Sequence, residues 1–164
     1  MRRNDREVTD IGLIRQILED CKTCHLAMVD NGRPYVVPLS YAYELAEETL
    51  NIFFHSAKEG RKIDILRENN NICFEMSSEG EAVFAAEAPC NSGYYYSSVL
   101  GFGNVYFIDN VAEKCSALSL LMKHQANVEV DFTPAQAENV CVFKAVSTNF
   151  TGKTKPRPAK RDSK

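Results

Sequence analysis

The sequence predicts a mainly β fold, an antiparallel barrel or sandwich with a few short helices. Seven short stretches carry the alternating pattern or the apolar run of a strand. Hairpin-type turn signals join several of them, and helical patterns are too few to alternate with strands, as a βαβ sheet requires. The 164 residues are enough for one domain with its own core.

The N-terminal third begins with an amphipathic helix over 9–21, for which Thr9 or Asp10 is the expected N-cap. Strands are predicted over 25–29 and 35–43. Asn31-Gly32 joins them as a hairpin, because both residues tolerate positive φ. Pro38 cannot donate to a strand ladder, so the second strand must lie at an edge or contain a bulge.

The remaining strands are predicted over 49–55, 71–76, 81–87, 99–108 and 140–146, with 71–76 and 81–87 joined at 77–80. Helices are predicted over 60–68 and 111–124, and a capping box with proline at the first helical position over 133–136. The basic, proline-containing end has no large apolar residue, so we expect a domain over 1–152 and a flexible tail over 153–164.

Composition excludes several classes of function. The net charge of −3 and the pI of about 5.7 argue against a nucleic-acid-binding domain. No apolar run approaches the roughly 20 residues of a membrane helix. The charged N-terminus is not followed by the apolar segment of a secretory signal, so a cytoplasmic location is expected, with no membrane partner.

A basic helix entrance is the most informative local feature. An apolar strand ends at His55, and after a turn of small residues the chain enters a helix at Gly60-Arg61-Lys62. Cations oppose the helix dipole at this end, whereas an anion fits both the dipole and the free amides. The segment therefore indicates a phosphate site, with a solvated basic turn as the alternative.

Three consecutive tyrosines precede two serines at 94–98. They cannot all be buried on one face of a strand, so at least one faces an interface or a ligand. An aromatic-rich sheet edge is the alternative interpretation.

The segment Cys21-Lys-Thr-Cys24-His25 matches the pattern of c-type haem attachment. Haem attachment is disfavoured because the sequence lacks the export signal that it needs. A zinc site is disfavoured because a fourth ligand is missing. A redox pair is disfavoured because such a pair would normally open a helix, whereas this one closes a helix. Structural cysteines and no metal site are therefore expected. His124 ends a helix, where an imidazolium is favourable and needs no catalytic role.

Two blocks, His55-Ser-Ala-x-x-Gly-Arg-Lys62 and Ser98-Val-x-Gly-x-Gly103, together with the stretch 34–39, resemble the pyridoxamine 5′-phosphate oxidase-like flavoproteins. Within that family the chain is most similar to nitroimidazole-resistance proteins. The resemblance covers about residues 1–152.

The resemblance implies an FMN-binding split β-barrel that forms a homodimer with two FMN sites at the interface. Arg61 and Lys62 would bind the FMN phosphate, and His55 and Ser56 would line the flavin site. The remaining implied contacts are Pro38, Leu39, Ser40 and Tyr41 along the isoalloxazine ring, and Tyr96, Ser97 and Ser98 from the partner subunit.

The implied activity is an FMN-dependent oxidoreductase that takes electrons from NAD(P)H and reduces small acceptors such as nitroaromatics. His55 is the candidate for polarising substrate or flavin, or else it only ends the strand. A non-catalytic flavin-binding or flavin-sensing protein, and a haem-binding split barrel with His25 or His124 as axial ligand, stay open. Oxidation of pyridoxamine phosphate would need a second basic cluster, which the sequence does not show.

Overall fold

The computed structural model describes residues 3–78 and 80–155. In this part of the chain seven antiparallel strands follow the order β3-β2-β6-β8-β9-β5-β4, with β1 beside β9 and β7 beside β8. The strands are β1 (Glu7–Val8), β2 (Thr23–Asp30), β3 (Arg33–Ser40), β4 (Ala42–Ala46), β5 (Thr49–Ser56), β6 (Asn71–Ser77), β7 (Glu81–Val83), β8 (Gly93–Phe107) and β9 (Cys141–Lys155). The helices are α1 (Ile11–Asp20), α2 (Arg61–Glu68), α3 (Val111–Ala126) and α4 (Pro134–Glu138), with 3₁₀ turns at Asn4–Arg6 and Pro89–Asn91.

The β2–β3 hairpin confirms the turn predicted from the sequence. Asn31 and Gly32 have φ values of 49° and 79°, and Asp30 pairs with Arg33 across the turn. Among the described strands β3 pairs only with β2, so Pro38 lies on an edge strand as expected.

The predicted strand over 35–43 is wrong, because the chain leaves β3 at Tyr41 and starts β4 at the other end of the sheet order. Tyr41 is fully buried, and its hydroxyl donates to the Leu18 carbonyl at 2.7 Å. The Gln125 amide donates to the Tyr41 carbonyl at 2.7 Å. These contacts fix the crossing between the two ends of the sheet.

Two strands are much longer than predicted. β8 begins at Gly93 rather than at 99, and β9 continues to Lys155, three residues into the predicted tail. The rest of that tail, 156–164, lies outside the described residues. β7 ends at Val83 and pairs with β8, so the predicted strand over 81–87 is too long and does not pair with 71–76.

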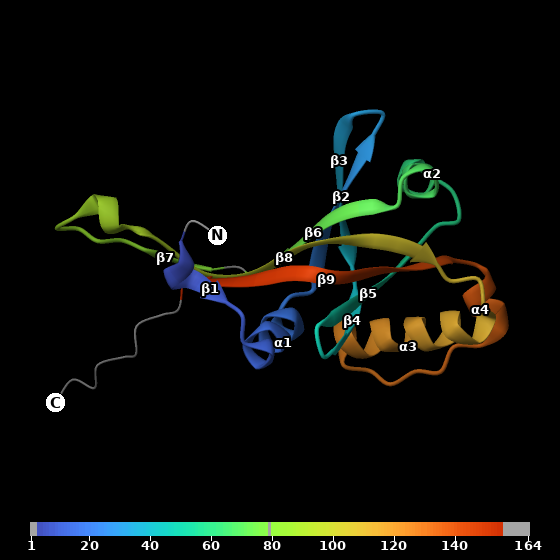
Figure 1. The fold of residues 1–164 in the computed structure, drawn as a ribbon. Coiled ribbons are helices and arrows are strands. Elements are labelled where there is room, and N and C mark those ends of the chain that lie inside the picture. The colour runs from blue at the N-terminus through green and yellow to red at the C-terminus, as the bar shows by residue number, and fades with distance from the viewer. Residues whose placement is uncertain (1–2, 79, 156–164) are drawn as a thin grey trace.

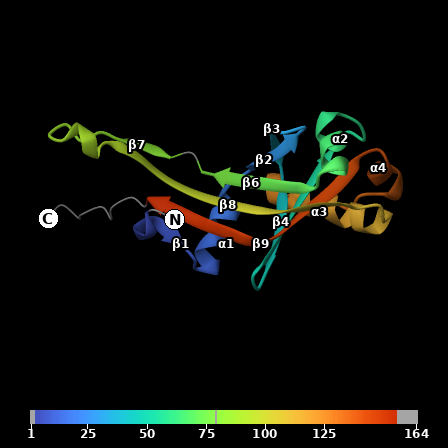
Figure 2. The ribbon, with the colours of Figure 1, turned by 45° about the horizontal axis from the view of Figure 1, so that its top comes forward.

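The extra length forms a projecting ribbon. β7, residues 93–98 of β8 and residues 151–155 of β9 extend away from the helices α2 and α3, to the left in Figure 1, and Figure 2 shows the same projection. We call these residues the ribbon.

The core has two parts. The barrel interior holds the fully buried Phe54, Phe74 and Phe143, two of which stack with ring centroids 5.3 Å apart. Burying each such ring contributes roughly 1.5–3 kcal/mol. A second cluster packs Leu118 and Leu121 of α3 against neighbouring strands.

Asp10 caps α1, and Thr133 with Gln136 forms the capping box of α4, as the sequence predicts. Asn110 caps α3. No helix in residues 3–78 or 80–155 has both the length and the apolar character needed to span a membrane.

Candidate functional site

The entrance of α2 leaves its first amides open to a ligand. Gly60, the N-cap, has a φ of 131° and no side chain with which to cap the helix. A φ in this range strains any residue with a Cβ, so glycine suits this turn. An uncapped helix N-terminus on the surface fits an anion.

Arg61 is held in place at this entrance. Its Nε and Nη2 donate to the Asp30 carboxylate at 2.9 and 2.8 Å, and its guanidinium lies 4.6 Å from the centre of the Tyr35 ring. The hydrogen bond from Arg61 lowers the pKa of Asp30. Both contacts leave guanidinium N–H groups free for a second acceptor. The sequence prediction missed Asp30 and Tyr35, since neither is near Arg61 along the chain.

Lys62 completes a pair of cations on consecutive residues. It is partly buried and makes no hydrogen bond or ion pair with any residue in the described part of the chain. A fixed guanidinium beside a free ammonium is the donor set that phosphate oxygens prefer. The two residues fit an FMN phosphate.

His55 and Ser56 end β5, directly before the turn that leads to Gly60. His55 is exposed and has no polar partner within the described ranges. The Ser56 hydroxyl donates to the neighbouring Ala57 carbonyl at 2.7 Å. An unpartnered imidazole is free to contact a bound molecule, whereas the Ser56 hydroxyl shapes the turn.

The four residues predicted along the isoalloxazine ring divide into three environments. Pro38 and Ser40 point outward from the edge strand β3, and Leu39 packs against the barrel core. The Tyr41 side chain belongs to the core, so it cannot contact a ligand at the surface without leaving it. No other described strand pairs with the outer edge of β3, which therefore offers main-chain groups.

Residues 3–78 and 80–155 leave apolar side chains exposed on one broad face of the sheet. Cross-strand pairing aligns Val36, Ala27, Cys73 and Phe102 in one row and Pro38, His25, Glu75 and Leu100 in the next. We call these eight residues the open face. Phe102 is 53% exposed, Val36 52% and Leu100 41%. Aligned apolar side chains at this exposure mark an interaction surface.

Tyr96 and Ser98 lie on the same side of β8 as Leu100 and Phe102, because alternate residues of a strand share a face. Ser97 faces the other way, with its hydroxyl 3.0 Å from that of Thr154. Tyr96 and Ser98 therefore continue the open face onto the ribbon, whereas Ser97 helps to join β8 to β9.

A single chain does not bring the two halves of the predicted site together. Arg61 contacts Asp30 at the turn end of β2. The pairing of β2 with β6, and of β6 with β8, places this end of the sheet at Asn104 of β8, which pairs with Asn71 of β6. Tyr96 lies eight residues further along β8, or roughly 26 Å of strand. Figure 1 shows α2 and the ribbon at opposite sides of the molecule.

The cysteine motif lies where α1 ends and β2 begins. Cys21 and Cys24 are buried free thiols, and burial raises the pKa of both, that of Cys21 to about 11. His25 is exposed beside Glu75, with Nδ1 and Oε2 3.2 Å apart. Within residues 3–78 and 80–155 no group of three or more His, Cys, Asp or Glu side chains could hold a metal ion.

His124 differs from its prediction. It is buried, its Nε2 lies 3.0 Å from the Cys21 carbonyl oxygen, and its Nδ1 lies 3.7 Å from Glu19. Burial, with a contribution from Lys22, lowers the pKa of His124, so the neutral ring is favoured rather than the imidazolium. The neutral ring is buried and its Nε2 donates to the Cys21 carbonyl, which argues against His124 as an axial haem ligand.

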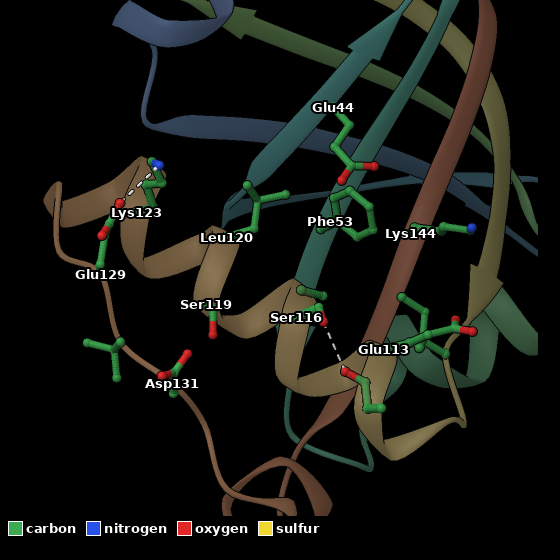
Figure 3. Close-up of a pocket in the computed structure, with 14 residues that line it drawn as sticks. Glu44, Phe53, Glu113, Ser116, Ser119, Leu120, Lys123, Glu129, Asp131 and Lys144 are labelled. Atoms are coloured by element: carbon green, nitrogen blue, oxygen red, sulfur yellow. Dashed lines mark hydrogen bonds and ion pairs between the residues drawn. The ribbon is translucent and has the colours of Figure 1, made fainter.

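A cavity beside α3 is separate from the α2 entrance. It has a volume of about 660 Å³ and lies between α3, the loop after it and the outer side of β4, β5 and β9. Figure 3 shows Phe53 and Leu120 surrounded by charged side chains. The charges are those of Glu44, Glu113, Glu129 and Asp131 against Lys123 and Lys144. This acidic surplus disfavours a phosphate, so size alone does not locate the nucleotide site.

The strand order, the crossing at Tyr41 and the basic helix entrance define the class of split β-barrel proteins. A family model described as pyridoxamine 5′-phosphate oxidase matches residues 12–154. The chain belongs to the pyridoxamine 5′-phosphate oxidase family.

Solved structures agree with this assignment. A candidate 5-nitroimidazole antibiotic resistance protein from Bacteroides thetaiotaomicron is 32% identical, with a TM-score of 0.77, covering 90% of this chain and 85% of that one. The flavocytochrome Anf3 from Azotobacter vinelandii (21% identity, TM-score 0.79, 99% and 75% covered) shares the fold. An FAD- and haem-binding protein from Mycobacterium smegmatis also shares the fold, with 17% identity and a TM-score of 0.77, covering 96% of this chain and 77% of that one. A comparison with curated protein sequences gave no match.

Proposed function

We propose that the chain is an FMN-binding oxidoreductase that works as a homodimer and reduces small acceptors, of the nitroaromatic type, with electrons from NAD(P)H. The observation that carries the proposal is the α2 entrance, where Asp30 and Tyr35 hold Arg61 beside the free Lys62. Similarity to a nitroimidazole-resistance protein supports the acceptor class. The flavin named in the descriptions of two proteins of this fold supports the cofactor class.

The residues of the chain would bind and orient the cofactor. Arg61 and Lys62 would hold the phosphate, and the unpaired edge of β3 at 38–40 would align the ring. Bound FMN would supply hydride and electron transfer. Exposed His55, next to the phosphate turn, would donate a hydrogen bond or a proton to the acceptor. No side chain needs to act as a nucleophile.

A second copy would complete the site. In one chain Tyr96 and Ser98 lie far from Arg61, and the open face between them exposes apolar side chains. Pairing two copies through the open face would bury these side chains and carry each ribbon toward the α2 entrance of the partner. This arrangement accounts for both the exposure and the separation.

The test compares FMN with riboflavin, which lacks the phosphate, by quenching of flavin fluorescence. Arg61→Ala with Lys62→Ala should reduce FMN affinity to the level of riboflavin and leave riboflavin binding unchanged. The matched control, Lys123→Ala with Lys144→Ala, removes the same charge at the acidic cavity and should leave both affinities unchanged. FMN affinity that survives loss of Arg61 and Lys62 would contradict the proposal.

Turnover is tested separately. The FMN-loaded protein should oxidise NADH or NADPH in the presence of a nitroaromatic. Tight FMN binding without turnover with either donor would replace the oxidoreductase by a non-catalytic flavin-binding protein on the same fold.

A further inference from the structure

A second, smaller cavity lies along α2, between the turn that precedes the helix and its last turn. Its volume is about 380 Å³, at the lower end of the range for small-molecule pockets. Its walls are formed by the β5–α2 turn, the last turn of α2, the end of β8, the first turn of α3 and the start of β9. The cavity is thus assembled from segments far apart in the sequence.

Three cations line this cavity against one carboxylate. Lys58, Arg67 and Lys114 come from three different segments, and Asp109 is the single acidic residue of the lining. None of the three cations has a hydrogen bond or an ion pair with a side chain in the described part of the molecule. Arg67 instead lies 5.7 Å from the centre of the Phe107 ring.

These three cations differ from Arg61, which is paired with Asp30, and from Lys123, which is paired with Glu129. Like charges that converge without counter-charges repel one another, although solvent screens part of that repulsion. Lys114 also lies near the N-terminal end of α3, where the helix dipole adds positive potential. An anion in the cavity would relieve this repulsion.

Cys141, on the cavity wall, does not compete with an anion. Burial raises the pKa of its thiol and Asp109 adds to this, while Lys114, Arg67 and Lys62 act in the opposite direction. The pKa stays above its ordinary value, so the neutral thiol is favoured near pH 7.

We propose that this cavity binds a small molecule through a phosphate or carboxylate group, with residues other than Arg61 and Lys62. Lys58, Arg67 and Lys114 would bind the oxyanion, and Phe107 would contact the apolar part of the molecule. The inference does not depend on the proposed flavin function.

The test uses the Arg61→Ala and Lys62→Ala double variant, in which the α2 entrance no longer offers phosphate its cations. Thermal unfolding is followed in inorganic phosphate, in citrate and in sodium chloride of equal ionic strength. Phosphate and citrate also stabilise proteins without binding, so a higher melting temperature in either salt supports the site only if Arg67→Gln with Lys114→Gln removes the difference from chloride. Equal melting temperatures in all three salts would overturn it.

Further substitutions assign the effect to the cavity. Adding Arg67→Gln with Lys114→Gln should weaken the apparent affinity for the anion about tenfold or more. Adding Lys123→Gln, on α3 but outside this cavity, should leave it unchanged. As a second readout, the anion should slow alkylation of Cys141 by iodoacetamide, followed by peptide mass. An effect that survives Arg67→Gln with Lys114→Gln would contradict the proposal.

Discussion

The barrel end and the ribbon end of the long sheet differ in how far their aromatic side chains are buried. At the barrel end Tyr41 is buried with its hydroxyl bonded, and Tyr35 supports Arg61. At the ribbon end Tyr94 is 61% exposed and Phe84 80%. The barrel end is complete within one chain, whereas the ribbon end exposes what a partner would cover. This difference makes a site shared between two copies the central claim.

The largest expected effect concerns the barrel end. Losing Arg61 and Lys62 removes two charge-assisted contacts of about 1.5–3 kcal/mol each, so FMN affinity should fall about 100-fold or more. Titration by flavin fluorescence measures the change. A fall below threefold would mean that the α2 entrance does not hold the phosphate.

The open face offers the next largest effect. Phe102→Lys places a charge where each copy would bury an aromatic ring, so the dissociation constant of the homodimer should rise about 100-fold. Sedimentation velocity over a concentration series measures it. Val128→Lys replaces a residue of similar exposure outside the open face and should not change it. A wild-type chain that sediments as a monomer would refute the dimer.

The ribbon end should show a smaller effect on cofactor binding. Tyr96→Ala removes one aromatic contact, so FMN affinity should fall about tenfold. Burial raises the pKa of Tyr96, but the neighbouring cations Arg6 and Lys153 outweigh it and lower the pKa overall. Ser97→Ala, on the other side of the strand, should leave FMN affinity unchanged. Equal effects of both substitutions would point to distortion of the ribbon instead of a contact.

Stability tests the claim that the barrel end is complete. Tyr41→Phe leaves the buried Leu18 carbonyl without its donor and should cost roughly 1–3 kcal/mol of unfolding free energy, measured by urea denaturation. Tyr43→Phe is the control, because the Tyr43 hydroxyl makes longer, exposed contacts of 3.2 Å. The control should lose less. Equal losses would contradict the role assigned to Tyr41.

The pH dependence of stability tests the same region through His124. Its pKa in the folded protein lies below the ordinary 6.5, so the unfolded chain binds the proton more tightly. The unfolding free energy should therefore be fully retained above pH 6.5 and fall as the pH drops below it. Urea denaturation of wild type and His124→Gln measures this, and the variant should lose part of the pH dependence. An unfolding free energy of the wild type that rises as the pH falls below 6.5 would contradict this expectation.

Local signals in the sequence predicted much of the fold. The Asn31-Gly32 hairpin, the caps of the main helices and the edge position of Pro38 follow from backbone preferences of single residues. The strand-like pattern of the sequence continues through residue 43. The pattern therefore could not show that the chain crosses at Tyr41 from one end of the sheet order to the other. The polar and aromatic start of β8 has no strand pattern, and its pairing with β7 and β9 creates the strand.

The site was predictable where its residues are consecutive. Arg61 and Lys62 stand out because two cations begin a helix. Asp30, which holds Arg61, contacts it only after the hairpin and α2 pack together. Lys58, Arg67 and Lys114 likewise converge only in the folded chain. The sequence therefore shows no second basic cluster.

Mixing two defective variants tests the shared site most directly. One variant carries Arg61→Ala and Lys62→Ala, the other Tyr96→Ala with Ser98→Ala, and the two are unfolded and refolded together. If each site combines the α2 entrance of one copy with the ribbon of the other, every mixed dimer regains one FMN site of wild-type affinity. Recovery of about one such site per mixed dimer is the predicted result. No recovery, in mixtures shown to contain mixed dimers, would contradict a site built from two copies.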